Sequence, residues 1–302
     1  MNRRNALGIL SALPAVGLIG HADAAPFKKR LRIAHITDTH IYAEKNAAQH
    51  TRTCLEKIVA MKQKPDVIFH TGDVIMDALF ADKDNVAAQW KLWQQVSGDI
   101  KIPIKYSIGN HDVWGLKKTG TAPLYGKQWA VDQMHIPNRY YSFELGGWQF
   151  IVLDSNLPVR ENTGYSAGID DEQFEWLNGE LKAVPVGKPV MILSHIPIFS
   201  ACIGDWMKLE NNEWKVSGAL MHTDSKKLRD LFAQYSQVKI GISGHLHLLD
   251  TVKYDGISYL GTGAVCGNWW NDNKLQRTSA GYAVLDLYPD GTFDRYYEDF
   301  KW

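Results

Sequence analysis

Short apolar runs alternate with longer amphipathic segments along most of the chain. The apolar runs are rich in Val, Ile and Leu and cover residues 31–37, 66–70, 104–108, 190–193 and 238–242, which predicts buried strands. Apolar residues at helical spacing predict helices over 51–62, 86–96 and 225–235, and a further helix capped by Asp170. Strands that alternate with helices in this way predict an α/β layered fold.

The second half of the chain adds segments with the shorter period of β-structure. Residues 140–145 and 149–154 flank Gly146-Gly147, a pair that favours the tight turn of a hairpin. After residue 248 only short β segments follow, at 251–254, 257–260, 282–287 and 293–297. We therefore expect residues 27–302 to form one α/β domain, in which 251–302 form mainly a second sheet packed on the first.

The first residues have the pattern of a sorting signal. Arg3 and Arg4 precede an apolar stretch over 6–20, and Ala22-Asp23-Ala24 is a small-x-small cleavage pattern. A bilayer span needs about 20 apolar residues, so the stretch is short for an anchor. We predict a cleaved signal peptide over 1–24, no transmembrane segment in the mature chain, and export to the periplasm or the outside. The two arginines match a twin-arginine signal only in part, so general secretion stays an alternative.

The amino-acid composition limits the classes of substrate and of metal site that we expect. The 33 Lys and Arg balance 33 Asp and Glu, and no block of like charge occurs, so a polynucleotide is not the expected substrate. The three cysteines, Cys54, Cys202 and Cys266, are far apart and form no zinc pattern, which predicts small buried thiols.

Polar residues that can bind metal recur directly after predicted strands. They are Asp38, His40, Asp73, Asn110, His195, His245 and His247. Ligands gather outside the carboxyl ends of strands in α/β sheets, so these side chains are expected to meet. Two neighbouring cations need an anionic bridge and several neutral ligands, and carboxylates with imidazoles supply both.

In order, these residues also form a signature. The series is Asp38-x-His40, Gly72-Asp73, Gly109-Asn110-His111-Asp112, His195 and Gly244-His245-x-His247. It resembles the signature of the calcineurin-like metallophosphoesterases. The resemblance implies a two-sheet β-sandwich flanked by helices, in four αββα layers.

The resemblance also implies roles for the individual residues. Asp38, His40 and His247 would hold one metal ion, Asn110, His195 and His245 the other, and Asp73 would bridge them. The ions would be divalent or trivalent Mn, Fe or Zn. A hydroxide between them would attack phosphorus, and His111 would protonate the leaving oxygen as general acid.

Departures from the family pattern indicate which branch of the family this chain resembles. Met76 stands where purple acid phosphatases have a tyrosine ligand, and the run from Gly72 to Asp77 lacks the protein-phosphatase motif. The aspartate that pairs with the catalytic histidine in those enzymes is displaced, so Asp77 or Asp112 is the candidate for that role. The pattern is most similar to class III cyclic-nucleotide phosphodiesterases, glycerophosphodiesterases and related exported phosphatases.

We therefore expect hydrolysis of small phosphate monoesters or diesters at a dinuclear metal centre. A strict phosphodiesterase for cyclic nucleotides or glycerophosphodiesters is the alternative. A non-catalytic metal-binding protein is the other class considered, against which the complete set of ligand positions argues. Trp269 and Trp270 are expected in a loop near the site, and the irregular stretch 199–221 has the length of a lid.

Overall fold

The computed structural model describes residues 30–115, 126–158 and 164–302. The predicted signal peptide at 1–24 and the predicted domain start at residue 27 lie outside the described residues. Within the described ranges, every helix is too short or too polar to cross a bilayer.

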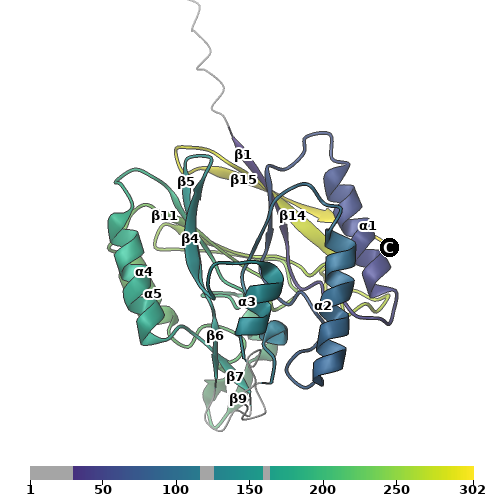
Figure 1. The fold of residues 1–302 in the computed structure, drawn as a ribbon. Coiled ribbons are helices and arrows are strands. Elements are labelled where there is room, and N and C mark those ends of the chain that lie inside the picture. The colour runs from purple at the N-terminus through teal and green to yellow at the C-terminus, as the bar shows by residue number, and fades with distance from the viewer. Residues whose placement is uncertain (1–29, 116–125, 159–163) are drawn as a thin grey trace, which may run out of the picture.

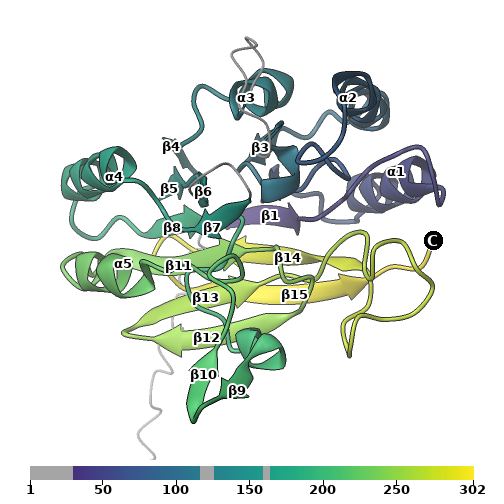
Figure 2. The ribbon, with the colours of Figure 1, turned by 90° about the horizontal axis from the view of Figure 1, so that it is seen from below.

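Two β-sheets form the centre of the molecule (Figures 1 and 2). The first has the order β15 (Phe293–Asp299), β14 (Gly281–Leu287), β1 (Leu31–Ile36), β2 (Val67–His70) and β3 (Ile104–Tyr106). The second has the order β12 (Asp250–Tyr254), β13 (Ile257–Gly261), β11 (Val238–Ser243), β8 (Val190–Leu193), β5 (Trp148–Val152) and β4 (Tyr141–Leu145).

The strands that precede the predicted ligands run parallel within each sheet. In the first sheet β1, β2 and β3 are parallel, and in the second β5, β8, β11 and β13 are parallel. Their carboxyl ends therefore lie on one edge of each sheet, where the loops that follow can meet.

The C-terminal segment does not form a second sheet of its own, so that prediction is wrong. Strands β12 and β13 extend the sheet of β11, whereas β14 and β15 pair beside β1. The register of β14 on β1, with Leu31 opposite Leu287, buries apolar side chains of both strands. The strand pattern identified each segment, but the partner of a strand depends on contacts far along the chain.

Helices cover the outer faces of the two sheets, as the four-layer expectation requires. Figure 1 shows α1 (Ala47–Val59) and α2 (Lys83–Ser97) on one side, and α4 (Asp171–Ala183) and α5 (Ser225–Phe232) on the other. The predicted cap is present, since the side chain of Asp170 accepts a hydrogen bond from the N–H of Gln173 at 2.9 Å.

The alternation of strand residues explains the layers. In β5 and β8, Ile151 and Ile192 pack in one cluster with Leu177 and Leu228 of the helices. Their strand neighbours point the other way and join the large cluster that contains the first sheet. Strands β5 and β8 are therefore buried on both faces, which is why their sequences are almost entirely apolar.

Smaller elements complete the chain. They are α3 (Gln128–Met134), β6 (Asn156–Pro158), β7 (Tyr165–Ala167), β9 (Lys208–Glu210), β10 (Glu213–Lys215) and the 3₁₀ turns Asn110–Asp112 and Cys202–Trp206. The predicted hairpin of β4 and β5 turns at Gly146 and Gly147, both with positive φ. Cys54 and Cys266 are buried free thiols, whereas Cys202 is only half-buried.

Candidate metal centre

The loops after β1, β2, β3, β8 and β11 converge, and they carry all seven predicted ligands. The loops after β1 and β2 run side by side: the N–H groups of Asp38 and His40 donate to the carbonyl oxygens of Gly72 and Asp73, both at 3.0 Å. The first sheet supplies the residues that follow β1, β2 and β3, and the second sheet supplies the three histidines that follow β8 and β11.

One group of ligand atoms contains Asp38, His40 and His247. Nε2 of His40 lies 3.2 Å from Nε2 of His247, and Oδ1 of Asp38 lies 3.3 Å from Nε2 of His247. All three side chains are buried.

A second group contains Asn110, His195 and His245. Nε2 of His195 lies 3.0 Å from Oδ1 of Asn110 and 3.2 Å from Nδ1 of His245. Asn110 and His195 are buried, and His245 is half-buried.

Asp73 joins the two groups through a single oxygen. Its Oδ2 lies 3.2 Å from Nε2 of His195 in one group and 3.5 Å from Nε2 of His40 in the other. Its other oxygen, Oδ1, accepts a hydrogen bond from the N–H of His111 at 2.7 Å, which fixes the carboxylate. The geometry therefore places the carboxylate of Asp73 between the two groups.

The histidines are oriented by hydrogen bonds to backbone carbonyls. Nδ1 of His195 lies 2.7 Å from the carbonyl oxygen of Thr71, and Nδ1 of His247 lies 3.0 Å from that of Gly267. A carbonyl only accepts, so each of these nitrogens carries a hydrogen, and in the neutral ring the opposite nitrogen offers its lone pair to a cation. Such contacts fix the tautomer and the ring plane of a metal ligand.

The backbone is strained where the ligands lie. Asp38, His40, Asp73, His245 and His247 all have φ between 38° and 68°, in the left-handed region. For residues other than glycine this region is unfavourable, and such outliers gather at functional sites.

Two glycines allow the loops to approach this closely. A Cβ on Gly109 would lie 2.1 Å from both N and Oδ1 of Asp73, and one on Gly244 would lie 2.4 Å from Oδ2 of Asp38. Glycine at these two positions therefore allows the backbone to come this close to the ligand carboxylates.

The residues present fit metal ions. Oδ2 of Asp38 accepts hydrogen bonds from Thr37 Oγ1 at 2.7 Å and from the N–H of His245 at 3.0 Å. Oδ1 of Asp38 is buried with no hydrogen-bond donor, which is costly for a carboxylate unless a cation is beside it. Facing imidazole nitrogens at 3.2 Å add lone pairs that converge on the same place.

The protonation of the histidines is consistent with a site built for cations. Burial disfavours the charged form of His195, but the neighbouring Asp73 outweighs it and raises the pKa of His195 to about 9. Burial and the neighbouring His195 lower the pKa of His245 to about 3. A cation would replace the proton that His195 holds.

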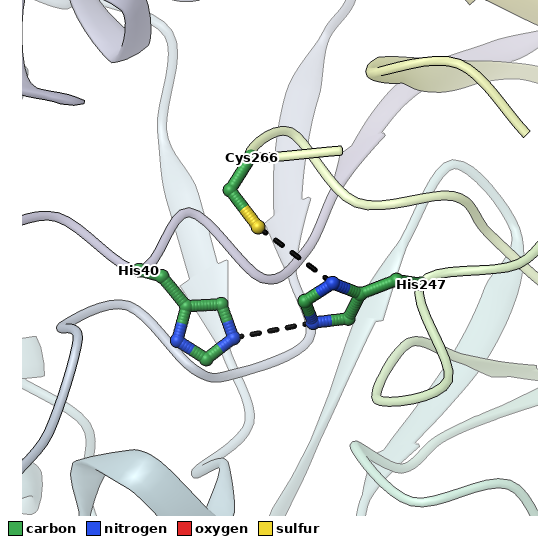
Figure 3. Close-up of side chains that lie close together, drawn as sticks. All are labelled: His40, His247 and Cys266. Carbon is green, nitrogen blue, oxygen red and sulfur yellow. Dashed lines mark hydrogen bonds between the residues drawn. The ribbon is translucent and has the colours of Figure 1, made fainter. Parts of the chain in front are cut away.

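Cys266 lies against the first group without belonging to it. Figure 3 shows its Sγ facing Nδ1 of His247, at 3.7 Å, while Nε2 of the same ring faces His40. The three side chains are close enough to hold a cation, and the sulfur faces Nδ1 of His247 rather than the Nε2 that faces His40. Burial raises the pKa of the Cys266 thiol and keeps it protonated, so the thiol packs against His247.

His111 lies at the edge of the site and is half-buried. Nδ1 of its ring is 2.7 Å from the carbonyl oxygen of Met76, and its ring centroid is 4.8 Å from that of His40. A ring nitrogen of His111 is within 4.8 Å of ligand atoms of His40 and Asp73. The predicted proton donor is therefore beside the cluster and outside the two ligand groups.

Asp112 was expected to be catalytic, through the ring of His111, and the structure corrects this. Its carboxylate accepts hydrogen bonds from the N–H groups of Asp73, Val74, Ile75 and Gly109 at 2.8–3.2 Å. Asp112 thus holds the loop that carries the bridging carboxylate. A short side chain at the end of a 3₁₀ turn reaches backbone donors more readily than the next ring along the chain.

The other candidate, Asp77, does not pair with His111 either. Its Oδ1 accepts from the N–H of Phe80 at 3.1 Å, as a turn residue does. The partner of the His111 ring is the carbonyl of Met76, which no side-chain pattern in the sequence reveals.

Ser194, His222 and Asp224 form a buried chain beside the site that resembles a nucleophilic triad. Nε2 of His222 is 3.1 Å from Oγ of Ser194, and Nδ1 of His222 is 2.9 Å from Oδ1 of Asp224. The hydroxyl of Ser194 donates to the carbonyl of Ile196 at 2.8 Å and is buried, so it is not a nucleophile. These hydrogen bonds hold His222 in place. The nearby carbonyl oxygen of Ala219 lies 3.0 Å from Nε2 of His245.

Trp269 contributes to the site although sequence reasoning gave it only a loop nearby. Its ring centroid lies 4.2 Å from that of His40 and 4.8 Å from that of His247. Two adjacent tryptophans after a Gly-Asn pair were the only signal in the sequence.

Comparison with known proteins gives an independent result. The family model for calcineurin-like phosphoesterases matches residues 31–249. A 3′,5′-cyclic-nucleotide phosphodiesterase of Nostoc sp. is 24% identical over 269 residues, which cover 88% of this chain and 91% of the relative.

Two further proteins are similar over nearly the full length. The 3′,5′-cyclic adenosine monophosphate phosphodiesterase CpdA of Escherichia coli is 24% identical over 279 residues, covering 87% of each chain. Among solved structures, a dimetal phosphatase from Danio rerio superposes with a TM-score of 0.60 at 14% identity, covering 86% of this chain and 94% of that one. That likeness shows a shared fold.

Proposed function

The chain belongs to the calcineurin-like phosphoesterase family, and we propose that it hydrolyses small phosphate esters, phosphodiesters above all, at a centre of two metal ions. The observation that carries the proposal is the position of Asp73. One oxygen of this carboxylate is 3.2 Å from His195 and 3.5 Å from His40, so it can serve two ions at once. A bridging carboxylate between two sets of neutral ligands is what a dinuclear site requires.

Each ion would have its own ligands besides the bridge. They are Asp38, His40 and His247 for one ion, and Asn110, His195 and His245 for the other, with Asp73 common to both. When bound, the ions would make water available as a nucleophile at neutral pH and offset charge on the phosphoryl oxygens. Imidazole, carboxylate and amide ligands accept Mn, Fe or Zn, and the ions supplied to the protein decide among them.

His111 would donate a proton to the leaving oxygen. The hydrogen bond of Nδ1 to the Met76 carbonyl holds the ring plane and reserves Nε2 for the ester. The backbone N–H of His111, bonded to Asp73, ties the position of this acid to that of the bridging carboxylate. The proton donor and the ligands are therefore held as one unit, which positioned catalysis needs.

The relatives support phosphodiesters as the favoured class. Two proteins that match over at least 87% of this chain are named as phosphodiesterases of cyclic nucleotides.

Reconstitution of metal-stripped protein tests the proposal. Protein loaded with Mn, Zn or ferrous iron is assayed with bis(p-nitrophenyl) phosphate, p-nitrophenyl phosphate, cyclic AMP and glycerophosphocholine. The stripped protein should be inactive and the loaded protein should cleave the diesters faster than the monoester. Stoichiometric binding of metal without turnover of any ester would instead support a non-catalytic metal-binding protein.

We also propose that the chain is exported after removal of residues 1–24. The support is the sequence pattern alone: Arg3-Arg4, the apolar stretch over 6–20 and Ala22-Asp23-Ala24. Sequencing the N-terminus of the protein recovered from the periplasm or medium tests it, because a first residue far from Ala25 contradicts the cleavage site.

A further inference from the structure

Two adjacent tryptophans form a tight turn next to the metal centre. The N–H of Asn271 donates to the carbonyl of Asn268 at 3.0 Å, and the residues between them, Trp269 and Trp270, have φ of 55° and 60°. Turns with positive φ at both central positions favour Asn and Gly. Bulky side chains in the left-handed region are unfavourable, so a turn of two tryptophans needs another reason for its residues.

The turn is held in place from two sides. Trp270 is buried, and its Nε1 donates to the carbonyl oxygen of His40 at 3.0 Å. The ammonium of Lys45 donates to the carbonyl of Trp269 at 3.2 Å and to Oδ1 of Asn271 at 2.7 Å. Trp270 thus explains the anchoring of the turn, and Trp269 is left to be explained.

Trp269 lies over the ligands and beside the proposed acid. Its ring is tilted by 41° on His40 and 35° on His247, and its centroid is 5.5 Å from that of His111. The residue remains 36% exposed. Trp269 is therefore packed on the imidazoles of the first ligand group and still reaches solvent, and its ring is close to the group that would protonate the leaving oxygen.

We propose that the exposed part of the Trp269 indole is a stacking surface for a planar ring of the substrate. The preferred esters are then those of aryl or nucleobase-bearing alcohols. The inference rests on the proposed function, because His111 marks the side on which the alcohol leaves. A cover for the ligands needs any apolar side chain, whereas a stacking surface needs a flat one, fixed at a defined angle.

Planarity is the property that separates the two roles. A phenyl group stacks on an indole, whereas a cyclohexyl group of similar size cannot, although it is the more hydrophobic. Phenylphosphonate and cyclohexylphosphonate carry these two groups and serve as test ligands. If Trp269 makes a plain apolar contact, the protein should bind cyclohexylphosphonate more tightly or both equally. If Trp269 stacks on the ligand, the protein should bind phenylphosphonate more tightly. An aromatic contact should favour the phenyl ligand by about 2- to 12-fold in affinity.

The experiment measures the affinities of these two phosphonates for metal-loaded protein by calorimetry, with bound metal determined for each variant. Glycine suits a φ of 55°, so in Trp269→Gly the turn can form without the ring, and the phenyl preference should disappear. Trp269→Phe keeps a flat face and should retain the preference. Trp269→Leu keeps an apolar cover without a flat face and should lose it. Trp176→Ala, on the outer helix α4, is the control and should leave the preference unchanged.

Two results overturn the inference: an unchanged phenyl preference in Trp269→Gly, or a phenyl preference kept by Trp269→Leu. The hydrolysis of bis(p-nitrophenyl) phosphate by the wild-type protein is followed in parallel. If the wild-type protein cleaves the ester but the preference for phenylphosphonate is the same in all variants of residue 269, only the stacking role fails. If it neither cleaves the ester nor binds either phosphonate, the proposed function fails and the inference falls with it.

Discussion

Nδ1 of His111 lies 2.7 Å from the carbonyl oxygen of Met76. Since the carbonyl can only accept, the hydrogen on Nδ1 is committed, and Nε2 is the nitrogen that remains for an incoming ester. A main-chain carbonyl takes the place that a carboxylate occupies beside many catalytic histidines. The orientation of this ring therefore depends on the loop between β2 and α2, which contains Met76.

Replacing His111 by alanine should slow turnover by about 10²–10⁴-fold while the metal content stays the same, because His111 is outside both ligand groups. The loss should shrink for p-nitrophenyl esters and grow for alkyl esters, whose leaving oxygens need the proton more. Initial rates across a series of leaving groups measure this. An equal loss across the series would rule out the role of proton donor.

Asp73→Asn should lose bound metal and nearly all activity, because an amide cannot supply the anionic oxygen that lies between His195 and His40. Metal analysis of the dialysed protein measures it. Asp77→Asn is the matched control, since the side chain of Asp77 accepts a turn hydrogen bond from the N–H of Phe80 and belongs to neither ligand group. Asp73→Asn with full metal content would contradict the bridging position.

Asp112→Asn should destabilise the protein by about 1–3 kcal/mol, because a buried carboxylate that accepts from several backbone N–H groups is replaced by an amide with one acceptor oxygen. Urea unfolding gives the free energy. The dependence of the rate on the leaving group should stay that of the wild-type protein, unlike that of His111→Ala. A changed dependence would restore a catalytic role to Asp112.

Metal should stabilise the protein more as the pH rises from about 6.5 to 9. In metal-free protein the pKa of His195 is raised from 6.5 to about 9, chiefly by Asp73 acting against burial. Protonation of His195 thus contributes stability that is complete below pH 6.5 and is lost as the pH rises through about 9. Metal-bound His195 has no proton to lose. Melting temperatures of metal-free and metal-loaded protein are compared at several pH values. A difference in melting temperature that does not change with pH would refute the expectation.

Gly244→Ala should weaken metal binding, because the added methyl group would lie 1.9 Å from Thr37 Oγ1 and 2.4 Å from Oδ2 of Asp38. Gly179→Ala is the control: Gly179 is inside α4 with nothing within 4 Å of the added carbon. There alanine should stabilise the helix by about 0.5–1 kcal/mol. Titration of both variants with metal compares them, and equal affinities would contradict the close approach at Gly244.

The local elements were predictable because their causes are local. The apolar runs located β1, β2, β8 and β11, and Asp170 located the start of α4. Helix α1 begins at Ala47, four residues before the predicted start, because Asn46 gives no side-chain cap that the sequence could signal. The sheet membership of β12 to β15 was wrong because pairing is decided between strands that are distant in sequence.

The ligand positions were predictable for a different reason. Asp, Asn and His at the ends of parallel strands are brought together by the topology, whatever the details of packing. The role of Asp112, the Met76 carbonyl and the position of Trp269 depend on backbone conformation within loops. Those conformations include positive φ at non-glycine residues, which residue type alone does not indicate.

Both ligand groups draw on both sheets, and the last ligand, His247, follows most of the chain. When synthesis has reached only β3, both ligand groups still lack their histidines from the second sheet. Both groups are complete, and able to bind ions, only once synthesis has passed β11. Folding of nearly the whole domain then precedes loading, so the compartment in which the chain completes its fold sets which ions it meets.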